Sequence, residues 1–376
     1  MKKYFYVVLI IFPIILIEIF LRLITIESEL HLRVLNKPWY NLLPLKIPET
    51  HLFLREPSKN GYKVYDPVLG WKINKNIESH PYYSNHQGLR VSKNDISRKI
   101  NVDSTEILTI GNSFTHGDEV LFKETWPFYL GKLSKRKVVN IGTSAYGIDQ
   151  AILSYLISPI KTDIVILGLI PGDLERATSI VYPGIYYGGY KSKPMFSFKK
   201  DNKYQILNQP CLFGLDIHKE LLIGEKSNFL KFDRNFDEKL FINNFFDFLY
   251  FNRIKKMFLY RENYMAKPIY ISPETDNYKY ILKIFKIFYN ECLEKEDFPI
   301  ISLLDNNNSF SDRIKYEDPW KNLTLDLKKI GFKVIEPSDS LPNLFKEEKN
   351  KVINSDGVHY TPIANKIVAR HIYNSF

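Results

Sequence analysis

The hydrophobic positions of this chain of 376 residues fall into short runs that alternate with helical stretches. Five runs of five or six residues are rich in β-branched side chains, which predicts strands buried on both faces. Helical periodicity between them is clearest at 151–158, 276–294 and 320–330. Strands that alternate with helices predict a mostly parallel sheet with helices on both faces. The five predicted strands cover residues 106–110, 137–141, 163–167, 298–303 and 332–336.

Residues from about 176 to 270 interrupt this alternation, and we interpret them as an insertion. A hairpin is predicted over 193–207, with Asp201-Asn202 as its turn. An aromatic-rich helical stretch follows at 241–260. Aromatic side chains of this kind favour packing on the core, and a second membrane-contacting surface is the alternative.

The N-terminus combines two lysines with a long apolar run over residues 4–24. As a helix rising about 1.5 Å per residue, this run just spans a hydrocarbon core of about 30 Å. No site of small residues follows, which argues against a cleaved signal peptide, and a buried soluble helix fits an apolar terminus poorly. We therefore expect a transmembrane signal anchor over 1–25 and a connector over 26–60. The remainder is expected outside the cytoplasm, in the periplasm or at the cell surface.

Composition excludes several classes of protein. The net charge is +10, but the basic residues are dispersed among acidic ones, so no nucleic-acid partner is expected. Two cysteines exclude a Cys-rich scaffold; Cys211 and Cys292 are either a disulfide or two buried thiols. Without an HExxH-like spacing or a glycine-rich nucleotide loop, we expect neither a metal nor a cofactor.

A candidate nucleophile follows the first predicted strand, where Gly111-Asn-Ser113 begins. In open parallel sheets, ligands bind beyond the carboxyl ends of the strands. Gly111 can adopt the positive φ of a sharp exit and so expose Ser113. The alternative is that Ser113 caps a helix.

A base and a carboxylate occur together near the C-terminus. A nucleophilic serine needs both. Thr361 and Pro362 predict the start of a helix, so His359 lies on the loop just before it, and Asp356 lies three residues upstream. The alternative is a capping aspartate beside a surface histidine.

These motifs resemble the blocks of the SGNH (GDSL-type) hydrolase family, in particular its membrane-anchored bacterial members. The resemblance covers roughly residues 60–376. It implies a flavodoxin-like three-layer α/β/α fold with a five-stranded sheet in a hydrolase-like domain over 61–376. It also implies cleavage or transfer of ester-linked acyl groups, often acetyl groups on carbohydrate. The matching segments are GNSFT at 111–115, NIGTSAYG at 140–147, GLIPGD at 168–173, DGVH at 356–359, and an upstream lead-in at 65–76 and 84–90.

The resemblance also implies roles for single residues. Ser113 would be the nucleophile, His359 the general base and Asp356 its orienting partner. Backbone N–H groups of Ser113 and Ala145 would hold the oxyanion. Gly172 stands where the family has an asparagine whose side chain is a further oxyanion donor, and loss of such a donor costs about 10²–10³ in rate. Further candidates for the pocket are Asn112, His116, Asp173 and Arg176.

The expected function is an extracytoplasmic, membrane-anchored serine esterase or O-acyltransferase. Its partners would be an acylated carbohydrate or another ester substrate, and the membrane through the N-terminal helix. One alternative is a catalytically weak protein that binds a glycan or a partner in envelope polysaccharide assembly. Another alternative is a lipase or thioesterase. Motifs alone do not distinguish among them, because a fold hosts many activities.

Overall fold

The computed structural model divides the chain into two compact units. The first comprises residues 1–56, 179–192 and 212–267, and the second comprises 57–178, 193–211 and 268–376. The predicted insertion at about 176–270 therefore contributes to both units. The residues described are 2–28, 31–35, 42, 61–182, 184–185, 191–199, 203–238, 242, 244–264, 267–316, 318–337 and 339–376.

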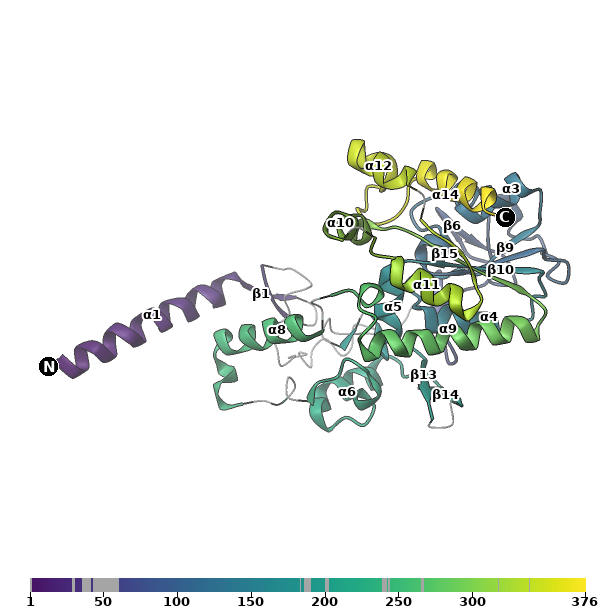
Figure 1. Cartoon of the computed structure of the whole chain (residues 1–376). Coiled ribbons are helices and arrows are strands. Elements are labelled where there is room, and N and C mark those ends of the chain that lie inside the picture. The colour runs from purple at the N-terminus through teal and green to yellow at the C-terminus, as the bar shows by residue number, and fades with distance from the viewer. Residues whose placement is uncertain are drawn as a thin grey trace. The chain divides into compact units, whose positions relative to one another are not determined.

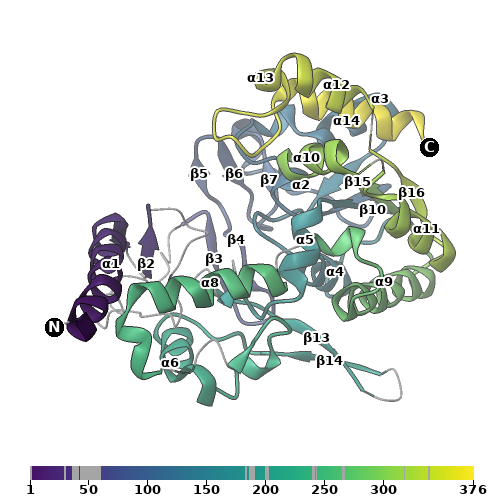
Figure 2. The same ribbon diagram turned by 60° about the vertical axis from the view of Figure 1, so that its left-hand side comes forward.

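A five-stranded sheet forms the centre of the second unit, and every neighbouring pair in it is parallel. The strand order is β9-β8-β10-β15-β16 (Figures 1 and 2). In chain order this is 2-1-3-4-5, the flavodoxin-like arrangement. All five predicted strands are confirmed. They are β8 (Ile107–Gly111), β9 (Val138–Asn140), β10 (Ile164–Leu169), β15 (Phe298–Leu303) and β16 (Lys333–Ile335).

Helices cover both faces of this sheet. The layer containing α4 (Ile148–Leu156), α9 (Asp276–Glu294) and α11 (Lys321–Ile330) matches the three predicted helices. On the opposite face α3 (Trp126–Ser134) packs against α14 (Pro362–Asn374) (Figure 1). The predicted start of α14 is confirmed, because the Thr361 hydroxyl accepts a hydrogen bond from Ala364 N at 3.2 Å.

Shorter elements complete the second unit. The predicted hairpin is confirmed as β13 (Met195–Phe198) paired with β14 (Tyr204–Leu207), and its turn at Asp201-Asn202 lies outside the described residues. The other strands are β3 (Lys63–Asp66), β4 (Gly70–Ile73), β5 (Glu78–Ser79), β6 (Tyr82–Ser84) and β7 (Arg90–Val91). The other helices are α2 (Ser113–His116), α5 (Pro171–Ala177), α10 (Asn307–Lys315), α12 (Ser340–Glu347) and α13 (Lys349–Val352), with single 3₁₀ turns at Lys93–Asp95, Phe122–Glu124 and Ile269–Ile271.

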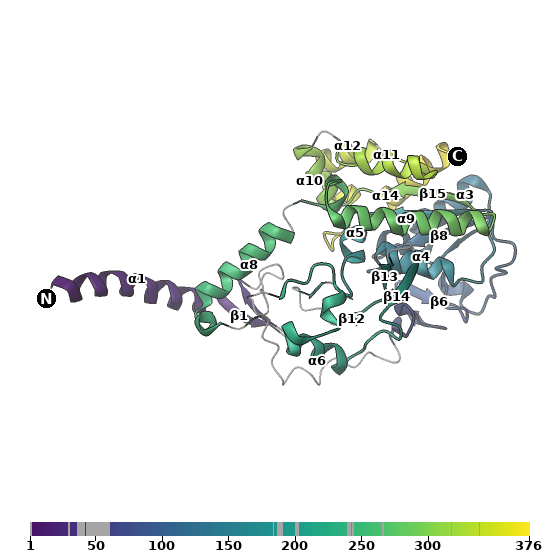
Figure 3. The ribbon, with the colours of Figure 1, turned by 60° about the horizontal axis from the view of Figure 1, so that its bottom comes forward.

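The first unit is built from short elements around two helices, α1 (Lys2–Ile24) and α8 (Tyr250–Tyr264) (Figure 3). Among the described residues, no helix is both long enough and apolar enough to cross a membrane, so the transmembrane anchor predicted over 1–25 is not found there. The remaining elements are β1 (Thr25–Ser28), β2 (His31–Val34), β11 (Val181–Tyr182), β12 (Lys191–Ser192), α6 (Leu215–Ile223) and 3₁₀ turns at Gly224–Lys226, Leu230–Phe232 and Phe245–Phe248.

The aromatic stretch at 241–260 departs from its prediction. We expected its aromatic side chains to be buried on the core, but Phe245 is 84% exposed and Phe246 is 61% exposed. Periodicity marks which residues share a face of a helix, but it does not show whether another element covers that face.

Both cysteines belong to the second unit and are free thiols. Cys211 and Cys292 are buried, and burial raises the pKa of each thiol to about 12. Of the two possibilities left open by the sequence, the structure has two buried thiols.

The exit from β8 depends on a glycine, as the sequence predicts. Gly111 has φ +145°, and a Cβ added to it would lie 2.6 Å from the carbonyl oxygen of Gly168 on β10. The adjacent strands therefore leave no room for a side chain at this position.

We predict that Gly111→Ala lowers the free energy of unfolding by about 2–5 kcal/mol, because strain at positive φ adds to a clash with backbone. Urea unfolding followed by tryptophan fluorescence measures this, since Trp71, Trp126 and Trp320 are buried in the second unit. Gly357→Ala is the control: Gly357 has φ +75°, but its added Cβ would meet nothing within 4 Å. If Gly111→Ala lowers the free energy of unfolding by no more than the control does, the close approach of Gly111 to the carbonyl of Gly168 would be contradicted.

Candidate active site

Three segments at the carboxyl edge of the sheet carry Ser113 and the predicted oxyanion positions. Ser113 follows β8, residues 141–147 follow β9, and Gly172 lies in α5, just after β10. Strand order reverses between β8 and β10, and ligands of such sheets bind at this switch point. The topology thus brings together segments that are separated by up to 60 residues of chain.

Ser113 is the first residue of α2. The N-cap is Asn112, whose side chain accepts a hydrogen bond from Phe114 N at 2.7 Å. The alternative that Ser113 itself caps the helix is therefore wrong. Ser113 is 6% exposed, so only a small part of it faces solvent at the edge of the sheet.

A buried carboxylate joins the β8 and β10 loops. Both oxygens of Asp173 accept from Asn112 Nδ2 at 2.6 Å, and Asp173 also accepts from Ile170 N at 3.1 Å. Burial raises the pKa of the Asp173 carboxyl to about 6, although Arg176 and Asn112 lower it. Asn112 and Asp173 were predicted as pocket residues, and the structure places both in the interior, where they bind each other.

Asp356 and His359 form the predicted carboxylate–imidazole pair. Asp356 Oδ2 lies 2.5 Å from His359 Nδ1, while Oδ1 accepts from the backbone N–H groups of Val358 and His359. Burial alone would raise the pKa of Asp356, but these N–H groups and the imidazole hold it below its usual range. The carboxylate is therefore ionised at neutral pH and accepts the Nδ1 proton, which leaves Nε2 of His359 as the basic nitrogen.

The loop of His359 reaches the residue next to Ser113. The ring of Phe114 lies 5.4 Å from the His359 ring and 4.8 Å from the Tyr360 ring, centroid to centroid. Among the described hydrogen bonds, none joins Ser113 to His359, so the proton transfer between them stays a prediction.

The loop after β9 is fixed to the loop of Ser113. Thr143 N donates to Gly111 O at 3.0 Å, and Asn140 Nδ2 donates to Thr115 O at 2.7 Å. Within this loop Ala145 has φ +69°, a region that favours glycine. The alanine keeps its N–H, so the predicted oxyanion donor survives in a glycine-like backbone conformation.

Space remains open at Gly172. A Cβ added there would have one neighbour within 4 Å, Arg176 Nη2 at 4.0 Å. Nη1 of Arg176 donates to Asp173 Oδ1 at 2.9 Å and to Tyr146 O at 3.2 Å. The guanidinium therefore lies beside the position where the missing asparagine side chain would begin, and its own side chain is 23% exposed.

A second polar network surrounds His116. Its Nδ1 lies 2.5 Å from Asp118 Oδ1, and its Nε2 lies 2.8 Å from the Tyr62 hydroxyl. Burial lowers the pKa of His116 to about 4, and the charge of Arg90 lowers it too, so the ring is neutral at pH 7. A neutral ring fits both contacts when Nδ1–H donates to Asp118 and Tyr62 donates to Nε2.

Asp118 connects this network to the predicted site. Burial alone would raise its pKa, but His116, His359 and the Ser144 hydroxyl together hold the pKa below its usual range. Ser144 directly precedes Ala145 in the chain, and its Oγ donates a hydrogen bond to Asp118 Oδ1 at 2.8 Å. Sequence reasoning missed Asp118; the only signal was its place two residues after His116.

Arg90 gives the upstream lead-in at 84–90 a structural role. Its buried guanidinium donates to the carbonyl oxygens of His116 and Gly117 at 2.5 Å, and to that of Val120 at 2.5 Å. Three carbonyls of the loop after Ser113 are thus held by one cation, which fits the planar donor geometry of arginine.

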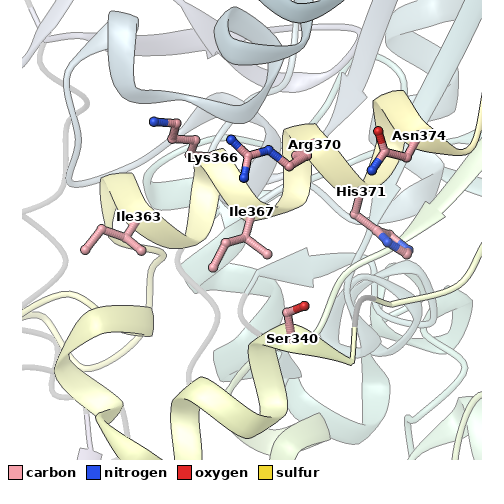
Figure 4. A pocket seen from close by; sticks show the side chains of 7 residues that line it. All are labelled: Ser340, Ile363, Lys366, Ile367, Arg370, His371 and Asn374. Atoms are coloured by element: carbon pink, nitrogen blue, oxygen red, sulfur yellow. The ribbon is translucent and has the colours of Figure 1, made fainter.

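A hollow of about 570 Å³ elsewhere on the second unit contains none of the predicted catalytic residues (Figure 4). Its lining has no carboxylate to orient His371, whose Nε2 contacts Glu336 O at 2.8 Å. The lining residues are Ser340, Ile363, Lys366, Ile367, Arg370, His371 and Asn374.

Comparison with known proteins finds only solved structures whose fold is similar to that of this chain. No protein-family model and no curated protein matches the chain. A G-D-S-L family lipolytic protein of Desulfitobacterium hafniense DCB-2 is 12% identical with a TM-score of 0.37, covering 72% of this chain and 99% of its own. An SGNH hydrolase of Slackia heliotrinireducens is 10% identical with a TM-score of 0.32, covering 73% of this chain and 99% of its own.

An acetyl xylan esterase of Butyrivibrio proteoclasticus is 9% identical with a TM-score of 0.34, covering 74% of this chain and 64% of its own. Similarities at this level establish neither membership of a family nor an activity. The chemistry of the site therefore has to be derived from the residues of this chain.

Proposed function

We propose that this protein is a serine esterase or O-acyltransferase that works through an acyl-Ser113 intermediate. One observation carries the proposal. Asp356 and His359 pair on one loop, and the imidazole of His359 lies 5.4 Å from the ring of Phe114, the residue next to Ser113. A nucleophile, a base and an orienting carboxylate are the three groups that acyl transfer requires.

The reaction proceeds in two steps. Ser113 Oγ attacks the ester carbonyl and passes its proton to His359 Nε2, and Asp356 stabilises the resulting imidazolium. The tetrahedral intermediate collapses, and the leaving alcohol takes that proton. In the second step water or a sugar hydroxyl loses its proton to His359 and attacks the acyl-serine. The new tetrahedral intermediate collapses, and Ser113 Oγ leaves and takes that proton back from His359. Water gives deacylation, and a sugar hydroxyl gives transfer.

Backbone N–H groups of Ser113 and Ala145 hold the oxyanion in this proposal. Arg176 supports the same side, because its guanidinium lies next to the open space at Gly172. A cation there would stabilise negative charge, whereas the neighbouring Asp173 carboxylate would oppose it, and Asn112 binds both oxygens of that carboxylate.

For the substrate we propose an acylated carbohydrate of the cell surface, as the sequence resemblance implies. A lipase or thioesterase is the second candidate, and one observation favours it. An apolar hollow of about 370 Å³ is lined in part by Ile141, Thr143 and Tyr146, which belong to the loop that carries Ala145. A substrate with a long acyl chain would make use of such a hollow.

A catalytically weak binding protein is the third candidate. Gly172 favours it, because the side-chain donor is absent there. A pure binding function does not require the Asp356–His359 pair, whose carboxylate is held in its ionised form.

We also propose that the protein is held at a membrane through α1, with the catalytic unit outside the cytoplasm. The apolar run over residues 4–24 supports this, as do the side chains of Ile15 and Ile19 on α1, each 49% exposed. Apolar side chains left this exposed on one helix favour a lipid environment.

We predict that a fluorophosphonate probe labels the native protein and fails to label Ser113→Ala, because only an activated serine reacts with it. In-gel fluorescence measures labelling, and hydrolysis of acetyl and octanoyl esters measures turnover. Ser311→Ala is the control, since Ser311 is exposed and its hydroxyl donates to Asn307 O within its own helix. Equal labelling of both variants would exclude Ser113 as the nucleophile. Preference for octanoyl esters would favour the lipase or thioesterase.

We predict that Gly172→Asn raises kcat/KM for an ester by about 10²-fold, because it adds a side-chain donor to the oxyanion. The open space at Gly172 admits the new side chain. Gly172→Ala fills the same Cβ position without a donor and should leave kcat/KM nearly unchanged. An equal response of the two variants would place the oxyanion elsewhere.

We predict that the native chain sediments with cell membranes and that replacing Ile15 and Ile19 by aspartate releases most of it. Burying each charge in hydrocarbon costs up to about 3 kcal/mol. Immunoblots of the membrane and soluble fractions measure the distribution, and protease added to intact cells tests exposure outside the cytoplasm. Recovery of native and variant chains in the same fraction would refute attachment through α1.

A further inference from the structure

The first unit exposes a group of phenylalanines that the proposed catalysis does not use. We call them the phenylalanine patch. Each phenylalanine ring left in water forgoes the free energy gained by burying it, so five exposed rings are unfavourable. Contiguous apolar surface of this kind marks a site of contact with another molecule or a membrane. The patch comprises Phe245 (84% exposed), Phe246 (61%), Phe248 (56%), Phe251 (59%) and Phe258 (56%).

The ring of Phe245 contacts two other rings of the patch. The Phe245 ring lies 5.4 Å from that of Phe246 and 5.8 Å from that of Phe248, in both cases edge to face. These three side chains are therefore one apolar surface and not separate exposures.

Helix α8 continues the patch along one face. Phe251, Lys255, Phe258 and Leu259 have the spacing i, i+4, i+7, i+8 and are exposed. Residues of the opposite face, such as Met257, are buried. The helix thus turns an apolar stripe outward, the reverse of an ordinary surface helix.

Polar contacts hold the patch against α1. Glu18 accepts from Tyr250 N at 2.9 Å and from Phe251 N at 3.3 Å, and Arg22 Nη2 donates to Phe248 O at 2.8 Å. The Arg22 guanidinium also lies 4.3 Å from the centre of the Tyr250 ring. The exposed patch is therefore continuous with α1, on which every large apolar side chain from Ile11 to Leu23 except that of Leu21 is 47–78% exposed.

The charge around the patch favours an anionic surface. Residues 242–259 contain three basic residues and one acidic residue, Asp247. Asp247 is buried and bonds Lys256 at 2.6 Å, so the exposed charge on this stretch comes from Lys255. The side chain of Arg22 on α1 is 48% exposed and is paired with Glu18 at 2.9 Å, so it offers donors to a headgroup without adding net charge. Apolar side chains next to exposed cations are typical of segments that lie in the interface of an anionic bilayer.

We propose that the phenylalanine patch inserts into the interfacial region of an anionic lipid bilayer. Phenylalanine has no polar tip to satisfy, so its ring can enter the acyl region while Lys255 and Arg22 meet the headgroups. This proposal is independent of the esterase. It holds whether α1 spans the bilayer or lies on it.

A fluorescent probe placed in the patch tests this directly. The full-length chain is prepared as Phe245→Cys and, separately, as Leu325→Cys, and each is labelled with the polarity-sensitive dye NBD. Leu325 lies on α11 of the second unit and is 47% exposed, so it is the matched control. The native thiols do not compete for the dye, because both are buried and burial raises the pKa of each to about 12.

The labelled proteins are mixed with vesicles of phosphatidylcholine and phosphatidylglycerol and floated on a density gradient. We expect the probe at 245 to shift to shorter wavelength and to be quenched by lipids brominated on their acyl chains. The probe at 325 should show neither change. Replacing Phe246 and Phe248 by serine should reduce the shift at 245 and leave the rate of ester hydrolysis unchanged.

Two results would overturn the proposal. In the first, the chain floats with the vesicles but the probes at 245 and 325 respond alike; α1 would then bind lipid without the patch. In the second, the probe at 245 shifts without vesicles and in proportion to protein concentration, which would assign the patch to a second copy of the chain. If the native protein does not hydrolyse esters, the wavelength shift and the quenching of the probe can still be measured. That result would refute the proposed esterase activity and not the insertion of the patch.

Discussion

The site depends on the buried carboxylate of Asp173. A carboxylate inside a protein is unfavourable unless hydrogen bonds compensate for the lost water. Here Asn112 Nδ2, the N–H of Ile170 and the Arg176 guanidinium supply them. Because these donors come from the loop after β8 and from α5, satisfying one carboxylate fixes the distance between the two segments on which Ser113 and Gly172 lie.

The need to satisfy the Asp173 carboxylate also positions Arg176. Its bond to Asp173 directs the guanidinium along α5, past the space that Gly172 leaves open. An arginine that forms an ion pair with Asp173 is therefore also the nearest cation, among the described residues, to the missing donor. The buried network of Asp118 and His116 acts on the opposite loop, where Ser144 and Ala145 follow β9. Both sides of the proposed oxyanion position are thus held by carboxylates, the fully buried Asp173 and Asp118, whose side chain is 14% exposed.

Much of the second unit could be predicted because its signals are local. Five apolar runs gave five strands, and Thr361-Pro362 gave the start of α14, since periodicity and capping act within a few residues. The Asp356–His359 pair lies within one loop, so its spacing alone indicated the contact. Arg90 and Tyr62 were missed because their partners become neighbours only after the sheet has formed, and the same holds for the bond between Asp118 and Ser144. Arg90, for example, binds carbonyls about 26–30 residues away.

The sequence by itself determined the order of the five sheet strands along the chain, the position of Ser113 after β8 and the type of the elements with a clear periodicity, because these follow from side chains close together in the chain. Tertiary structure decided which residues are covered. Phe245 and Phe246 are as hydrophobic as any core residue, yet they are exposed, whereas Arg90 and Asp173 are charged and buried. Burial depends on which element packs against a face, and the pattern of hydrophobic residues along the chain does not show which element that is.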